Sequence, residues 1–207
     1  MGKRLKNFIG TRSIMNIKNQ KEYFNETYES WKEISDEKDR IINKTINMLG
    51  ISEEDSLLDI ASGTGVLYSA LKHLKLSNYL ALDISENMLK ELKELYPEAE
   101  TICDDFDKEI KLKDEFNYII VFNSIPHFES LNIVFLNAWR HLKAGETFAI
   151  VHSKTRNGLK QHHKSMDYNL GRDAIPNDDV LHKLVEKYEF KDCVVMDEDF
   201  FYFSCKK

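Results

Sequence analysis

Two glycines stand directly after an apolar run, in the stretch LLDIASGTGVL at residues 57–67. Gly63 and Gly65 separate this run, which is typical of a buried strand, from a segment with helical periodicity. Glycine permits positive φ and a close approach of the backbone to a ligand, and the start of a helix offers free N–H groups. Asp83 ends the next apolar run, 20 residues after Gly63, at the spacing at which an acid can accept hydrogen bonds from ribose hydroxyls. The pattern predicts a nucleoside site at the ends of two strands.

The residues around this turn favour one kind of nucleoside ligand over another. A dinucleotide fingerprint, GxGxxG, needs a third glycine where this chain has Tyr68. Asp59 lies four residues before Gly63, and its carboxylate would be repelled by a pyrophosphate. A carboxylate at this point suits a ligand with a positively charged amino group. The sequence therefore disfavours a nicotinamide-dependent reductase.

Two further segments carry polar side chains to the ends of later strands. The segment FNSIPHF, residues 122–128, offers Asn123, Ser124 and His127, and the segment HSKTRNGLKQHH, residues 152–163, begins with His152. His127 or His152 could act as a base for an acceptor that must lose a proton, although histidines at strand ends are often only hydrogen-bonded structural residues.

Arg156 and His163 lie in the second of these segments. Arg156 could bind a carboxylate or phosphate of a substrate, and a surface salt bridge is an equal alternative. The histidines lack an HxxxH spacing on a clear helix, so we expect no metal site.

Strands and helices alternate along the chain. The expected strands are residues 56–61, 79–83, 99–103, 116–122, 146–152, 193–197 and 200–205, and the expected helices are residues 19–31, 36–48, 65–74, 86–95, 130–142 and 178–188. Alternation of this kind predicts βαβ units and a mostly parallel sheet with helices on both faces. The last two strands are too close together for a crossover helix and should form an antiparallel hairpin. The polar stretch at residues 153–177 fits no regular element, and we expect a functional or mobile loop there.

The stretch LLDIASGTGVL resembles the first motif, D-x-G-x-G-x-G, of class I S-adenosylmethionine-dependent methyltransferases, with Ala61 at the first glycine. The stretch LALDISENML resembles their second motif and CDDF their third. HLKAGETFAI resembles their LKPGG turn, from which Ala144 and Glu146 depart. The resemblance runs from about Phe24 to the C-terminus and implies a Rossmann-like, seven-stranded sheet of order 3-2-1-4-5-7-6.

The resemblance also implies roles for individual residues. Asp83 would hold the ribose, Ile84 would pack on the adenine, and Asp104 would contact the adenine amino group, with Asp105 or Phe106 lining the site. The cofactor-binding residues implied in this way are Asp59, Ala61, Gly63, Gly65, Asp83, Ile84, Met88, Asp104, Asp105, Phe106 and Asn123. N-terminal helices over about residues 19–50 would cover the site as a lid, and the residues expected to meet the acceptor are Tyr28, Arg156 and His163.

We expect an S-adenosylmethionine-dependent enzyme with a small-molecule acceptor, because the chain has no large insertion with which to grip a macromolecule. The alternatives are an RNA or protein methyltransferase, or a protein that binds S-adenosylmethionine without catalysis. The segment after the fourth strand reads NSIP rather than NPPY, which disfavours nucleobase or glutamine amide N-methylation.

Composition supports these expectations. With 207 residues and 42% hydrophobic residues, the chain is most simply one domain, residues 19–207, and no apolar run approaches the roughly 20 residues that span a bilayer. The formal net charge of −6 makes nucleic acid an unlikely partner. Three cysteines without CxxC spacing favour a protein of the reducing cytoplasm. We expect the protein to be a monomer or a homodimer. Residues 1–18 are expected to be a basic tail outside the fold, and Met15 within this tail offers a second start.

Overall fold

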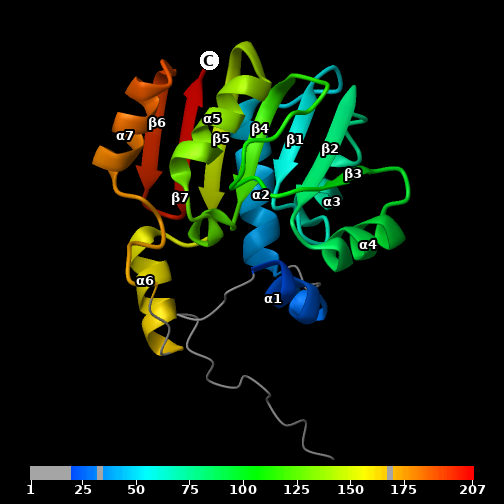
Figure 1. The fold of residues 1–207 in the computed structure, drawn as a ribbon, viewed down its shortest axis with the longest axis horizontal. Coiled ribbons are helices and arrows are strands. Elements are labelled where there is room, and N and C mark those ends of the chain that lie inside the picture. Colours follow the sequence, from blue (N-terminus) through cyan, green and yellow to red (C-terminus); the bar gives the residue numbers. More distant parts are fainter. Residues whose placement is uncertain (1–19, 32–34, 167–169) are drawn as a thin grey trace, which may run out of the picture.

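The computed structural model describes residues 20–31, 35–166 and 170–207. These residues form one seven-stranded sheet with helices on both faces, as Figure 1 shows. The expectation for the basic tail at residues 1–18 lies outside the described residues.

The sheet has the order β3-β2-β1-β4-β5-β7-β6, as predicted. Its strands are β1 (Ser56–Ile60), β2 (Asn78–Asp83), β3 (Glu100–Cys103), β4 (Phe116–Phe122), β5 (Leu142–His152), β6 (Lys191–Asp197) and β7 (Phe201–Lys206). Strands β1 to β5 pair in parallel, while β7 runs antiparallel to both β5 and β6. The predicted C-terminal hairpin is therefore confirmed.

The helices alternate with the strands. They are α1 (Gln20–Thr27), α2 (Asp36–Leu49), α3 (Val66–Leu71), α4 (Glu86–Leu95), α5 (Leu131–His141), α6 (Arg156–Ser165) and α7 (Asp178–Lys187), with 3-10 turns η2 (Tyr28–Trp31) and η3 (Ile125–His127). Gly50 ends α2 in the left-handed conformation, and the Ser85 side chain accepts a hydrogen bond from the N–H of Met88 at the start of α4. Both signals had been readable in the sequence.

Each face of the sheet has its own apolar core. Successive residues of a strand point to opposite faces, so Leu58 joins the core beneath α5 and α7, whereas Leu57 joins the core beneath α2, α3 and α4. All five residues of β1 are buried, because helices cover the sheet on both sides. The carboxyl ends of the parallel strands stay uncovered by these helices, and α1 and α6 lie beyond that edge (Figure 1).

Two expectations about helices need correction. Residues 153–177 were expected to lack regular structure, but residues 156–165 form α6, whose N-cap Thr155 accepts a hydrogen bond from Gly158 N–H. This helix is almost entirely polar, and Leu159 is the buried residue that anchors it, so its sequence carries no apolar stripe. The helix expected over residues 19–31 divides at Tyr28 into α1 and η2.

Among the described residues, no helix combines the length and the apolar character needed to cross a membrane.

Candidate active site

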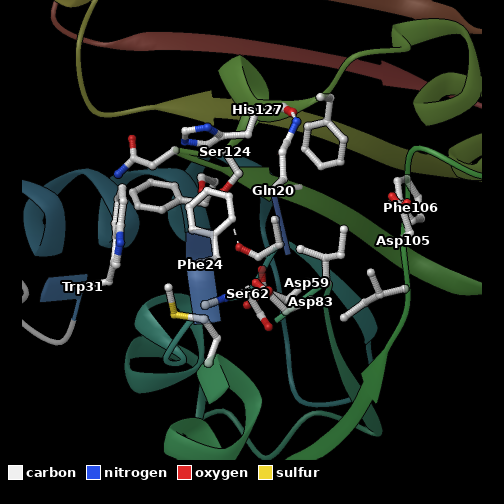
Figure 2. A pocket seen from close by; sticks show the side chains of 18 of the residues that line it. Gln20, Phe24, Trp31, Asp59, Ser62, Asp83, Asp105, Phe106, Ser124 and His127 are labelled. Atoms are coloured by element: carbon white, nitrogen blue, oxygen red, sulfur yellow. Dashed lines mark hydrogen bonds between the residues drawn. The ribbon is translucent and has the colours of Figure 1, made fainter. Parts of the chain in front are cut away.

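A cavity of about 430 Å³ opens at the carboxyl ends of β1, β2 and β4. Twelve of the residues singled out from the sequence line it: Asp59, Ala61, Gly63, Asp83, Ile84, Met88, Asp104, Asp105, Phe106, Asn123, Ser124 and His127. Figure 2 shows His127 and Ser124 on one side of this cavity and the acids Asp59 and Asp83 on the other, with Phe24 between them in this view. The sequence motifs thus converge on one hollow.

The loop after β1 is tied to the end of β2 by the Asp83 carboxylate. The N–H of Gly63 donates to Oδ2 of Asp83 and the N–H of Ser85 donates to Oδ1, each at 2.8 Å. Burial raises the pKa of Asp83 above its ordinary value, while these backbone N–H groups lower it. Asp83 therefore orders the turn and the start of α4, and it also lines the cavity.

The two motif glycines differ in what they do. Both have positive φ, +56° at Gly63 and +89° at Gly65. A Cβ at Gly65 would lie 3.0 Å from Cγ of Leu92, so this glycine permits the close packing of α3 on α4. Gly65 is not among the described residues that line the cavity, in contrast to Gly63. Ala61, at the place of the first motif glycine, also has a positive φ of 53°.

Asp59 is the most deeply buried acid of the cavity, with 1% of its surface exposed. Burial raises its pKa to about 7, the charge of Asp83 adds to this rise, and a hydrogen bond from Tyr79 opposes it. The Tyr79 hydroxyl donates to Oδ2 of Asp59 at 2.7 Å. The sequence analysis missed Tyr79, although a tyrosine in a strand next to a motif acid was a signal available in the sequence.

Helix α1 and η2 contribute the outer wall of the cavity through Gln20, Phe24 and Trp31. Gln20 Nε2 donates to the carbonyl of His127 at 2.6 Å. No residue of α1 is buried, so its aromatic side chains serve the cavity more than the core. The sequence analysis expected a lid here but named Tyr28, which is not among the described lining residues.

Asn25 fastens α1 to the start of α4. Its Oδ1 accepts hydrogen bonds from Ser85 Oγ at 2.7 Å and from Asn87 N–H at 3.1 Å, and its carbonyl accepts from Asn87 Nδ2 at 2.9 Å. An ion pair of 2.7 Å between Lys21 and Glu86 lies beside these bonds. Helix α1 is thus held by polar contacts near the cavity rather than by apolar burial.

His127 lies where the segment after β4 meets α1 and η2. Its ring centroid is 5.0 Å from that of Phe24 and 6.4 Å from that of Trp31. Burial lowers its pKa to about 4, and the nearby His163 and Arg172 act in the same direction. Near pH 7 the imidazole is therefore neutral. Arg172 fixes this segment by donating from Nη2 to the carbonyls of Pro126 and Phe128, at 2.9 and 2.7 Å.

The residues of the second histidine segment occupy other places. Among the described lining residues of the cavity, neither His152 nor His163 nor Arg156 appears. His152 is 6% exposed and its Nδ1 accepts the N–H of Lys154 at 3.0 Å; burial lowers its pKa to about 4.

Arg156 is engaged in internal contacts. It pairs with Asp178 at 2.7 Å and Asp197 at 3.6 Å, and its guanidinium lies 4.7 Å from the ring centroid of Phe201. The geometry agrees with the ion-pair alternative for Arg156. In the described ranges, no three His, Cys, Asp or Glu side chains are grouped so as to hold a metal ion.

The cavity has an acidic lining that suits a cationic ligand. Its acids are Asp59, Asp83, Asp104, Asp105, Asp107 and Glu129, against Lys38 and Lys108. Lys108 already pairs with Asp105 at 2.9 Å. Ser62 Oγ, also in the lining, is buried and has no hydrogen-bond partner among the described residues, so a ligand with a polar group would satisfy it.

An open α/β sheet of this strand order, with an acidic cavity at its carboxyl ends, is the architecture of class I S-adenosylmethionine-dependent methyltransferases. Residues 58–150 match a family model described as a methyltransferase domain. The match identifies a methyltransferase domain in this chain, and S-adenosylmethionine is the cofactor of such domains.

Several solved structures share the fold. Phosphoethanolamine N-methyltransferase 2 of Haemonchus contortus, in complex with S-adenosylmethionine, has 16% identity and a TM-score of 0.69 over 96% of this chain and 60% of that one. In another structure of that enzyme, with S-adenosylhomocysteine and phosphomonomethylethanolamine, this chain spans 52% of its length. Magnesium protoporphyrin IX methyltransferase of Synechocystis, with bound S-adenosylhomocysteine, has 14% identity and a TM-score of 0.66 over 90% of this chain and 97% of that one. No curated protein matches the sequence.

Proposed function

We propose that this protein transfers the methyl group of S-adenosylmethionine to a small-molecule acceptor bound between the lid and His127. The observation that carries the proposal is the arrangement of the cavity. Two buried acids, Asp59 and Asp83, stand near the ends of adjacent strands, and α1 and η2 contribute Phe24 and Trp31 to the same cavity. A cavity of about 430 Å³ with a helix closing its mouth suits a small acceptor better than a polymer.

The lining residues fit the cofactor group by group. Asp83 would hold the ribose hydroxyls, since a carboxylate that accepts two backbone N–H groups keeps further lone pairs for a ligand. Ile84 and Phe106 would contact the adenine, with Asp104 or Asp105 near its amino group. Asp59 would face the positively charged amino group of the cofactor.

When bound, the cofactor supplies an activated methyl group, which the acceptor takes up by direct displacement. Alignment and exclusion of water then carry much of the catalysis. We assign His127 to the acceptor side, because it lines the cavity together with Asn123 and Ser124. With its pKa lowered to about 4, neutral His127 is a weak base, so its main task would be to orient the acceptor through a ring nitrogen.

The related structures include a phosphoethanolamine N-methyltransferase and a magnesium protoporphyrin IX methyltransferase, so the fold alone does not select one acceptor. The test has two stages. Calorimetric titration with S-adenosylmethionine, S-adenosylhomocysteine and NAD should give micromolar binding of the adenosyl ligands only, and Asp83→Ala should weaken it strongly. Preference for NAD, or no adenosyl binding, would contradict the proposal.

In the second stage, transfer of labelled methyl groups is measured against a panel of small amines, alcohols, thiols and carboxylates. Turnover that falls in His127→Ala, with cofactor affinity retained, supports the assignment of His127. Cofactor binding without turnover on any member, but with turnover on RNA or protein, would favour a macromolecular acceptor instead.

A further inference from the structure

Tyr79 does not line the cavity itself, but its hydroxyl contacts Asp59, one of the cavity acids. In the parallel ladder, Leu57 lies opposite Tyr79 and Asp59 lies opposite Ala81, so Asp59 and Tyr79 share one face of the sheet. The hydroxyl of Tyr79 donates to Oδ2 of Asp59 at 2.7 Å. Tyr79 is 8% exposed and Asp59 is 1% exposed, so water cannot easily replace either partner.

The surroundings of Asp59 make its ionisation sensitive to this bond. Burial and the negative charge of Asp83, at the end of β2, raise the pKa of Asp59, whereas the bond from Tyr79 lowers it. The balance leaves the pKa at about 7. On the helix side, Tyr68 of α3 and Tyr96, which follows α4, are the titratable groups next to Tyr79, and Lys38 of α2 lines the cavity.

The ring of Tyr79 would be just as well packed without its hydroxyl. It packs against the tilted ring of Tyr68, with ring centroids 4.5 Å apart, and belongs to the apolar core beneath α2, α3 and α4. A phenylalanine would fill the same space and would avoid burying a polar atom. The hydroxyl is therefore explained by what it does for Asp59.

We infer that Tyr79 is a positioning residue, which orients the Asp59 carboxylate and keeps it ionised for the amino group of S-adenosylmethionine. The inference rests on the proposed role of Asp59 in cofactor binding. A hydrogen bond to the charged form of a carboxylate favours that form, and its loss shifts the pKa upward by about one unit or more.

The experiment compares wild type with Tyr79→Phe by calorimetric titration of S-adenosylhomocysteine at pH 6.5 and pH 9. If the pKa of Asp59 rises by about one unit from about 7, the dissociation constant rises about eightfold at pH 6.5 and changes less than about 1.5-fold at pH 9. The amino group of the ligand titrates equally in both proteins, so the ratio of their affinities isolates Asp59. The ligand 5′-methylthioadenosine has no amino acid moiety and should bind both proteins alike at both pH values.

The matched control is Tyr68→Phe. Tyr68 is a buried neighbour whose hydroxyl donates to Glu98 at 3.0 Å rather than to a site acid. Its loss should leave the pH profile of binding unchanged. In the Asp59→Asn background, Tyr79→Phe should add no pH-dependent loss.

An equal loss of affinity at both pH values would show that Tyr79 acts only through packing, and unchanged affinity would overturn the inference outright. If the wild-type protein itself fails to bind S-adenosylhomocysteine, that result contradicts the proposed function rather than the pairing of Tyr79 with Asp59. If circular dichroism shows Tyr79→Phe to be unfolded, 3-fluorotyrosine placed at position 79 takes over the test. Its more acidic hydroxyl should tighten binding at pH 6.5, and absence of that effect would refute the inference.

Discussion

The burial of Asp59 should make the stability of the protein fall as pH rises through neutrality. The ordinary pKa of this carboxyl is 3.8, and burial raises it to about 7 in the folded protein. Between these values the unfolded chain releases the proton and the folded chain keeps it, so folding becomes less favourable with each step upward in pH. Above pH 8 the loss levels off at about 4 kcal/mol, since each pKa unit corresponds to about 1.4 kcal/mol.

The substitution Asp59→Asn removes the titration and leaves an amide oxygen that can still accept from Tyr79. Of the loss of about 4 kcal/mol, about 3 kcal/mol falls between pH 5 and pH 8.5. We therefore expect the difference in unfolding free energy, variant minus wild type, to grow by about 3 kcal/mol over this interval. All other groups titrate in both proteins and cancel.

Urea denaturation followed by circular dichroism at the two pH values measures this difference. Asp199→Asn is the control: its exposed carboxylate pairs with Arg40 at 2.9 Å, which lowers its pKa, so it stays ionised across the interval. Its effect on stability should be the same at both pH values. A pH-independent difference for Asp59→Asn would refute the reasoning, because it would mean that Asp59 is ionised at pH 5 in the folded protein.

Four other substitutions test neighbouring parts of the structure. Ala61→Gly should raise stability by about 0.5–1 kcal/mol in thermal unfolding, because a residue with a Cβ is strained at the positive φ of 53°. An unchanged melting temperature would contradict this. Ser62→Ala should keep the melting temperature but weaken S-adenosylhomocysteine in calorimetry, since the buried hydroxyl has no partner among the described residues; equal affinity would contradict this. Asn25→Ala should speed release of S-adenosylhomocysteine in stopped-flow measurements, because it removes hydrogen bonds that hold α1 against α4. The loss of stability should be small, because no residue of α1 is buried. An unchanged release rate would show that these hydrogen bonds do not retain the ligand. Burial lowers the pKa of His152 to about 4 from 6.5, so the free energy of unfolding should decrease as pH falls from 6.5 to 4.5. In His152→Gln this decrease, measured by urea denaturation, should be smaller by about 2 kcal/mol. An equal decrease in both proteins would contradict the prediction.

The strand order and most of the cavity were predictable because their signals are local. Alternating apolar runs gave the strands, and the glycine turn with Asp83 lies within a single βαβ unit. Side chains at the carboxyl ends of parallel strands must meet at one edge, so the topology alone brings Asn123 and His127 toward Gly63.

The contacts that the sequence did not reveal join distant segments or lack a periodic signature. Gln20 donates to the carbonyl of His127 across 107 residues of sequence, and Asn25 meets Asn87 across 62. No short stretch of the sequence contains both partners of these contacts, so no local pattern could predict them. Arg172 similarly binds carbonyls on either side of His127 from a stretch expected to be irregular. Helix α6 escaped prediction because one buried side chain, Leu159, creates no pattern.

Three features that cost free energy in the folded state lie within the four residues from Asp59 to Ser62. A carboxylate is buried beside a second acid, Ala61 holds a conformation that favours glycine, and the Ser62 hydroxyl is the one buried side-chain polar atom without a partner in the described ranges. Strain kept in this way is usual where a ligand completes the structure. A cationic, hydroxyl-rich ligand would neutralise the acids and satisfy the serine at once. The segment that is most recognisable in the sequence therefore also carries strain, and the proposed role in cofactor binding would explain both properties.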